Sequence, residues 1–206
     1  MKLNFESKIF QAVSTVSTLL LHNILWFVCC LPIITIGSAT AAMYRITFNL
    51  REGKATSISA FGAAFRENFK KATISWSVIL VFGFAAVFYL NSLTTFSDLL
   101  VRRVLLAVFL IVLIPVAIAS IYIFPLLAYY DNTVLQTWKN AVTVGMLKLP
   151  QTIGIVVLQL SPFLSVFVWP EWFLRLGIIW ILLAPSMIMY WNSSVFLKLF
   201  HSLQAE

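Results

Sequence analysis

Few side chains in this sequence could carry out chemistry, and the only imidazole inside an apolar stretch is that of His22, which precedes Asn23. An ionisable group at membrane depth is by default a candidate proton relay or ligand site. His22 has no acidic or thiol partner at metal-ligand spacing, so we interpret it as hydrogen-bonded between helices. Cys29 and Cys30 are adjacent in an apolar run, and we interpret them as packing residues.

No other combination of residues indicates catalysis. We find no serine, histidine and acid placed as a nucleophilic triad, and no glycine-rich phosphate loop. The long apolar stretches contain no pair of carboxylates, which argues against a proton-coupled pump. The sequence therefore predicts no enzyme, no catalytic or metal-binding residue, no cofactor, and no ability to drive transport with ATP by itself.

The composition is that of a chain whose solvent is lipid. Of the 206 residues, 61% are hydrophobic and only 10% are charged, whereas soluble domains carry about 25% charged residues. The mean hydropathy is +0.97. The formal net charge of +7 then favours lysine- and arginine-rich loops that face anionic lipids over a nucleic-acid partner. We expect residues 1–206 to form a single all-α membrane domain.

Stretches free of charged residues predict the spanning helices. They are Ile9–Tyr44, Ala72–Ser97, Val104–Tyr130, Leu149–Pro170 and Leu176–Leu197. Each of the last four suits one span of about 20 residues. The first is too long for one span, and Pro32 followed by Gly37 predicts a break that makes it a hairpin.

Three segments show the pattern of helices that lie in the membrane interface. Apolar residues share one helical face in Phe10–Leu20, Ser59–Lys71 and Val134–Leu149. The alternative is that each segment is an extension of the span that follows it. Together they suggest a threefold repeat of surface helix plus helical hairpin.

The distribution of basic residues favours six spans with both termini in the cytoplasm. That arrangement places 11 of the 14 basic residues inside, as the positive-inside rule requires. Five spans would move Lys2 and Lys8 outside and weaken the asymmetry. With six spans, Trp169 and Trp172 are expected at the outer interface.

Three motifs resemble the signature of the YesL family, bacterial membrane proteins catalogued as a domain of unknown function. They are Asn23-Ile-Leu-Trp26, Leu31-Pro32-Ile-Ile-Thr35-Ile-Gly37 and Ala41-Ala42-Met43-Tyr44. Phe65-Arg-Glu-Asn68-Phe69-Lys70 is similar to the family's phenylalanine- and lysine-rich segment. The resemblance covers roughly the whole chain and implies a multi-span protein of the plasma membrane, mostly of Gram-positive bacteria. It carries over no catalytic residue. We expect the signature side chains to serve helix packing: Asn23, Trp26, Pro32, Thr35, Gly37, Ala41 and Tyr44.

The resemblance also implies a functional context, because genes of that family commonly neighbour those of sugar importers of the ABC class and of glycoside hydrolases. The leading expectation is a non-catalytic accessory subunit or regulator of a carbohydrate (oligosaccharide) ABC importer, in contact with its permease subunits. The alternative is a self-standing small-solute carrier or channel, with a polar path lined by Asn23, Asn91, Gln159 and Asn192. Five cytoplasmic side chains are candidates for contacting a partner or anionic lipid: Arg66, Lys70, Lys71, Lys139 and Lys148. The sugar, the transporter and the oligomeric state stay open.

Overall fold

The computed structural model describes the backbone of residues 2–95, 97–168 and 170–204. It describes the side chains of residues 10–95, 97–162, 164, 170–171, 175, 177 and 181–204. Trp169 and the side chain of Trp172, both expected at the outer interface, lie outside these described residues, as do the side chains of Lys2 and Lys8.

The described residues form helices and no strand. The α-helices are α1 (Lys2–Cys30), α2 (Ile36–Arg51), α3 (Ile58–Ser92), α4 (Leu99–Tyr129), α5 (Val134–Leu147), α6 (Leu149–Val168) and α7 (Pro170–Gln204). Short 3₁₀ turns η1 (Ile33–Thr35) and η2 (Leu93–Thr95) follow α1 and α3. This agrees with the all-α fold that the composition predicts.

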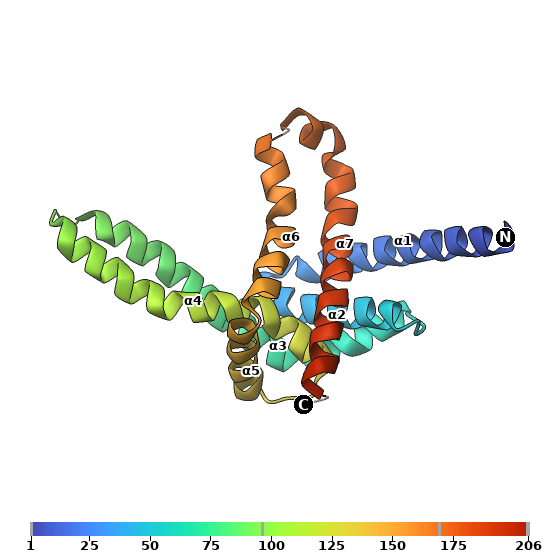
Figure 1. The fold of residues 1–206 in the computed structure, drawn as a ribbon, viewed down its shortest axis with the longest axis horizontal. Coiled ribbons are helices and arrows are strands. Elements are labelled where there is room, and N and C mark those ends of the chain that lie inside the picture. Colours follow the sequence, from blue (N-terminus) through green and yellow to red (C-terminus); the bar gives the residue numbers. More distant parts are fainter. Residues whose placement is uncertain (1, 96, 169, 205–206) are drawn as a thin grey trace.

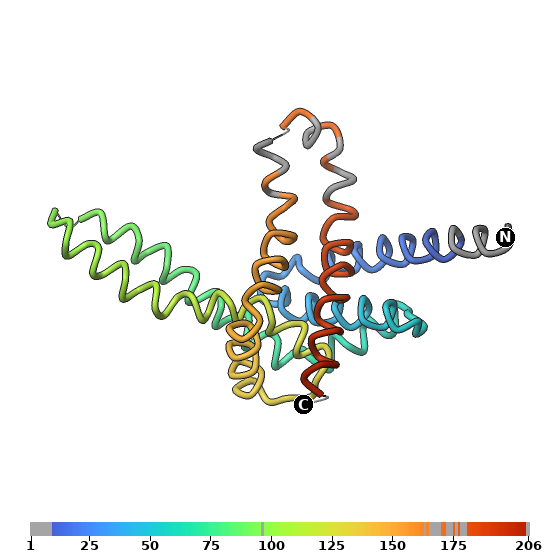
Figure 2. The backbone as a smooth tube through the Cα atoms, viewed as in Figure 1, coloured from blue at the N-terminus to red at the C-terminus, as the bar shows by residue number. Residues whose placement is uncertain are grey.

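The helices pair into three hairpins, α1–α2, α3–α4 and α6–α7, which meet around α2 (Figure 1). Helix α2 packs against α1, α3, α4 and α7. The smooth trace shows the α3–α4 hairpin extending away from this centre as one arm and α6–α7 as another (Figure 2). The junction around α2 therefore holds most of the buried residues among those described, and the outer parts of both arms lie outside it.

The first hairpin breaks where Pro32 and Gly37 predict. Helix α1 ends at Cys30, and Thr35 donates its hydroxyl to the carbonyl oxygen of Pro32 at 2.7 Å. A Cβ at Gly37 would lie 2.6 Å from the carbonyl oxygen of Ala72, so only glycine permits this approach of α2 to α3. Ala41 and Ala42 are also fully buried. Small residues thus bring the backbones of α2 and α3 together.

Two of the three expected surface helices are not separate elements. Phe10–Leu20 lies within α1 and Ser59–Lys71 within α3, so both continue into the apolar helix that follows. Nothing in those sequences interrupts the backbone hydrogen bonds between the polar and apolar parts. The continuity of these two segments with the helix that follows agrees with the alternative and not with separate surface helices.

Helix α5 is a separate element and is joined to α6 at a 100° bend. It begins with a capping box, in which the hydroxyl of Thr133 accepts from the backbone of Gln136 and the Gln136 side chain accepts from the Thr133 backbone. Its buried face is Thr137, Ala141, Val144 and Gly145. Leu135 and Leu149 are exposed, whereas Thr137 and Val144 are buried. The face of α5 that packs against α4 therefore overlaps only partly with its apolar face.

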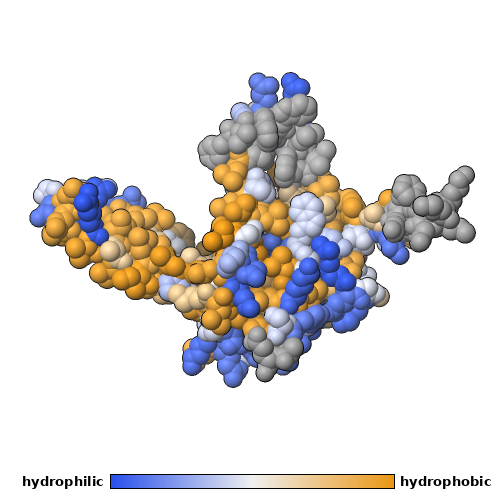
Figure 3. All heavy atoms as spheres, in the orientation of Figure 1, coloured by the Kyte–Doolittle hydropathy of each residue, from blue (hydrophilic) through white to orange (hydrophobic). Residues whose placement is uncertain are grey.

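Three helical segments among the described residues are long and apolar enough to cross a membrane: Phe10–Cys30, Ile58–Thr95 and Leu99–Tyr129. A fourth is counted if the bent pair Val134–Leu147 and Leu149–Pro162 forms one span. Apolar side chains cover most of the visible surface of the α3–α4 arm, and hydrophilic ones gather at its outer end (Figure 3). Such exposure is stable only when lipid or another apolar surface replaces water, which indicates a membrane protein.

Candidate functional site

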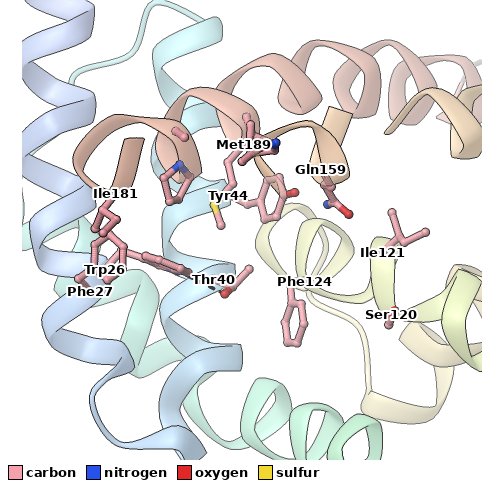
Figure 4. A pocket seen from close by; sticks show the side chains of 14 residues that line it. Trp26, Phe27, Thr40, Tyr44, Ser120, Ile121, Phe124, Gln159, Ile181 and Met189 are labelled. Atoms are coloured by element: carbon pink, nitrogen blue, oxygen red, sulfur yellow. Dashed lines mark hydrogen bonds between the residues drawn. The ribbon is translucent and has the colours of Figure 1, made fainter. Parts of the chain in front are cut away.

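A cavity of about 410 Å³ lies where the three hairpins meet. Helices α1, α2, α4, α6 and α7 all contribute to its walls (Figure 4). Aromatic rings form much of the lining, from Trp26, Phe27, Tyr44 and Phe124. No side chain that lines it is charged among the described residues. The cavity therefore suits an uncharged or amphipathic molecule better than an ion.

Polar groups gather at one part of this cavity. Figure 4 shows the ring of Tyr44 pointing toward the side chain of Gln159, and the Tyr44 hydroxyl interacts with the amides of Gln159 and Asn192. Asn192 is fully buried, yet neither of its amide atoms has a well-aligned hydrogen-bond partner among the described residues. A buried amide without such a partner costs free energy, so this spot can accept a hydrogen-bonding ligand group or a water molecule.

Trp26 and Thr40 close another part of the wall. The indole nitrogen of Trp26 donates to the hydroxyl of Thr40 at 3.3 Å and joins α1 to α2. Ser120 of α4 also lines the cavity, but its hydroxyl donates to the carbonyl oxygen of Ala117 in its own helix. The indole is thus already satisfied, and the serine hydroxyl can meet a ligand only by rotating away from that carbonyl oxygen. The amides of Gln159 and Asn192 have hydrogen-bonding groups left over.

Pro185 lines the cavity from α7 and shapes that helix. Proline has no amide hydrogen, so the carbonyl oxygen of Ile181, four residues earlier, loses its helical donor. The side-chain nitrogen of Asn23 donates to that oxygen at 3.1 Å and to the oxygen of Leu182 at 2.6 Å. The first signature residue thus joins α1 to the proline site of α7, directly behind the cavity wall.

The other signature residues divide between this cavity and the first hairpin. Trp26 and Tyr44 line the cavity. Pro32 and Thr35 form the turn, while Gly37 and Ala41 lie in the close packing of α2. Their assignment to helix packing remains a prediction about function.

His22 links two helices, as its sequence context suggests. The ring is buried, with Nδ1 2.8 Å from the carbonyl oxygen of Thr18 and Nε2 3.3 Å from that of Ser57. Ser57 caps α3, so the contact ties α1 to the start of α3. A neutral imidazole can donate to only one of these two acceptors, and which nitrogen carries the hydrogen depends on the tautomer.

The proposed polar path is only partly assembled. Gln159 lines the cavity, with Asn192 and Asn23 beside its wall. Asn91 is exposed and lies apart from them at the end of α3. Its backbone carbonyl oxygen accepts a hydrogen bond from the Thr94 hydroxyl. The four amides therefore do not form one continuous path across the described structure.

The candidate cytoplasmic contact residues also separate. The ammonium nitrogen of Lys71 lies 2.5 Å from a carboxylate oxygen of Asp131. The hydrogen bond and the charge of Lys71 hold the pKa of this exposed carboxyl below its usual range. Arg66, Lys70 and Lys139 make no ion pair or hydrogen bond with the part of the chain that the structure describes. Lys148 lines a groove together with Lys198, which no sequence pattern singled out.

Two arginines have structural roles that charge counting did not indicate. Arg45 donates to the carbonyl oxygen of Ala128 at 2.9 Å, near the end of α4. Arg51 donates to the carbonyl oxygen of Tyr190, and its guanidinium lies 3.7 Å from the centre of the Tyr190 ring. The sequence gives no indication of these contacts, because the partners lie on helices that are distant along the chain.

Comparison with known families agrees with the signature motifs. Residues 19–92 match the family described as "Protein of unknown function, DUF624", which is the YesL-type domain. The match spans the second half of α1, all of α2 and all of α3. No curated protein and no solved structure gives a significant match to the chain.

Proposed function

We propose that this chain is a non-catalytic accessory subunit or regulator of a carbohydrate ABC importer, and that its α3–α4 arm packs against a permease subunit within the bilayer. The importer class rests on the resemblance to the YesL family. The observation that carries the docking role is the unpartnered outer half of the α3–α4 arm.

Burial along the two long helices of this arm stops at matched positions, and beyond them only Leu93, at the described part of the arm's turn, is buried. The last buried residue of α3 is Ser75, and the first buried residue of α4 is Ala119. Beyond them the two helices contact chiefly each other, with the ring of Tyr89 stacked on Phe109 at 4.4 Å. The Tyr89 hydroxyl also donates to the carbonyl oxygen of Leu105 at 2.9 Å. These contacts hold the arm together as a hairpin without support from the rest of the described chain.

The outer face of α3 bears large side chains at helical spacing. Phe84 and Phe88 are 74% and 76% exposed, and Val81 lies on the same stripe. Lipid covers such a face without hydrophobic cost, so association with another helix depends on shape and van der Waals contact. Two adjacent phenylalanine rings supply a shaped surface of that kind for a helix of the permease.

We further propose six spans with cytoplasmic termini, in which each hairpin crosses the membrane twice as one of three repeats. The turns of the α3–α4 and α6–α7 arms lie far from the C-terminal end of α7 (Figure 1). At about 1.5 Å per residue, the 20 residues of α6 match the hydrocarbon thickness of a bilayer. Lys54 lies on the loop between α2 and α3, away from the arm turns, which accords with the positive-inside rule.

Purification of the tagged chain from native membranes tests the accessory role. We expect permease subunits of a carbohydrate importer to co-purify with the natural chain. They should be lost from a Phe84→Ala/Phe88→Ala variant that still inserts and migrates as a folded protein. The matched control Ile24→Ala/Val28→Ala removes two exposed side chains of the same spacing from α1 and should retain the permease.

Two outcomes would overturn this proposal. One is that no importer subunit accompanies the natural chain, and the other is that the phenylalanine variant retains it fully. Reversing Arg66 and Lys70 to Glu separately tests docking through the cytoplasmic face. Loss of the permease from that variant alone would move the interface from the arm to the basic part of α3.

A second candidate function, a carrier or channel for a small solute, is favoured by the cavity and by the unaligned amide of Asn192 beside Tyr44. If the cavity holds a transported solute, Gln159→Leu should reduce uptake into proteoliposomes of the purified chain. Gln151→Leu, which changes an exposed glutamine of the same helix, should not. Absence of uptake by the natural chain across a panel of sugars and polyols would count against this function.

A further inference from the structure

A second, polar groove of about 230 Å³ lies at the junction of α5 and α6 beside the last turns of α7. Lys148 and Gln151 line it from the junction, and Ser194, Lys198 and Ser202 line it from α7. Two lysines from distant parts of the sequence therefore share one depression. It is separate from the aromatic cavity, with which it has no lining residue in common.

The charge of this groove is not neutralised by the described protein. No acidic residue lines it, and Lys148 and Lys198 make no ion pair among the described residues. Three described carboxylates already pair with other cations, as Lys54–Glu52, Arg45–Glu67 and Lys71–Asp131. Two neighbouring cations without a counter-charge form a site for an anion.

The donors in the groove suit an oxyanion. The two ammonium groups and the Gln151 amide make no hydrogen bond with the described residues and are available. The hydroxyls of Ser194 and Ser202 donate to their own helix, to Trp191 and Leu199, each at 2.7 Å, and can rotate toward a ligand. A phosphate group, with several acceptor oxygens, can meet both lysines and the amide at once.

An apolar groove of about 330 Å³ begins at the next residue, Leu149, between α4 and α6. Its lining includes Ile153 and Val157, which are exposed one and two turns further along α6. The charged and apolar grooves are thus lined by consecutive residues of the chain, Lys148 and Leu149. A ligand that carries an anionic head and an aliphatic chain would use both surfaces.

From this juxtaposition we propose that the Lys148–Lys198 groove binds the phosphate of an anionic phospholipid, whose acyl chain lies along Leu149, Ile153 and Val157. The site sets the depth of α6 in the bilayer by holding one headgroup at the α5–α6 bend. It depends on neither the importer association nor solute transport. It requires only that the bend lies at headgroup depth.

Native mass spectrometry of the purified chain with added phosphatidylglycerol or phosphatidylcholine tests this site. We expect retained phosphatidylglycerol and little phosphatidylcholine. Lys148→Gln/Lys198→Gln should weaken phosphatidylglycerol retention about tenfold or more, because each basic group near a headgroup contributes to binding. The charge-matched control Lys70→Gln/Lys139→Gln removes two unpaired lysines elsewhere and should change retention far less.

Two results would overturn the proposal. Equal losses in the two double variants would mean that lipid follows net charge and not this groove. The second result concerns free phosphate. Inorganic phosphate would stabilise the natural chain against heat but not the Lys148→Gln/Lys198→Gln variant, while both proteins retained the same amount of lipid. The groove would then bind a free phosphate instead of a lipid. An Ile153→Gln variant tests the proposed position of the acyl chain in vesicles that contain phosphatidylglycerol. We expect this variant to fold like the natural chain and to retain less phosphatidylglycerol.

Discussion

The side-chain nitrogen of Asn23 lies 3.1 Å from the carbonyl oxygen of Ile181, 158 positions further along the chain. Pro185 deprives that oxygen of its helical donor, so Asn23 supplies from α1 the hydrogen bond that α7 lacks. An unsatisfied carbonyl inside a membrane protein is costly because no water replaces the missing donor. This contact therefore couples the first hairpin to the third.

Asn23→Leu should destabilise the folded chain by about 1–2 kcal/mol, since interhelical hydrogen bonds in membranes and orphaned buried acceptors are of that size. The loss should be much smaller in a Pro185→Ala background, because an alanine amide restores the intrahelical bond to Ile181. Unfolding of the four proteins of this double-mutant cycle in detergent measures the difference. Equal losses in both backgrounds would show that Asn23 acts independently of the proline.

Gly37→Ala should lower the stability by about 1–3 kcal/mol, as overpacking does. A Cβ there would lie 2.6 Å from the carbonyl oxygen of Ala72 and 2.8 Å from the Cβ of Trp76, and neither can move cheaply. Gly62→Ala in α3 is the control, because nothing lies within 4 Å of its added Cβ. The control should be neutral or slightly stabilising, since alanine favours helix. Thermal unfolding followed by size-exclusion chromatography compares the two.

Thr152→Val should loosen the bend between α5 and α6. The Thr152 hydroxyl contacts the hydroxyl of Tyr122 at 2.7 Å and the carbonyl oxygen of Gly145 at 2.9 Å, and it is buried. Valine keeps the shape but leaves Tyr122 and Gly145 without this partner, at a cost of about 1–3 kcal/mol. Thr152→Ser should recover most of the loss, and Thr143→Val, on the exposed face of α5, should have little effect. Proteolysis of the bend in detergent measures the loosening.

The six-span proposal predicts which loops an impermeant thiol reagent reaches in intact cells. With Cys29 and Cys30 replaced by serine, Ser97→Cys at the turn of the α3–α4 arm should be labelled. Lys54→Cys, between α2 and α3, should be labelled only after the cells are opened. Labelling of position 54 in intact cells would reject cytoplasmic termini with six spans.

The sequence alone determined the features that depend on neighbouring residues and on lipid as the solvent. Charge-free stretches indicated the apolar helices, and Pro32 with Gly37 indicated the break in the first hairpin. These signals are local, because a missing amide hydrogen or a run of apolar side chains acts on its own segment. The motifs of the first hairpin likewise indicated the family that residues 19–92 match.

Only the tertiary structure decided which helix faces meet. Hydrophobicity did not indicate which face of α5 is buried, and it suggested surface helices that are continuous parts of α1 and α3. It also gave no indication that Asn23 would satisfy Ile181 or that Lys148 and Lys198 would share a groove. Lipid is as apolar as leucine, so a hydrophobic pattern does not distinguish a face that packs on protein from one that meets the bilayer. Which faces pack together is decided by close approach of backbones, by carbonyl oxygens that a proline leaves without a donor, and by paired charges. These features become visible only when distant segments are brought together.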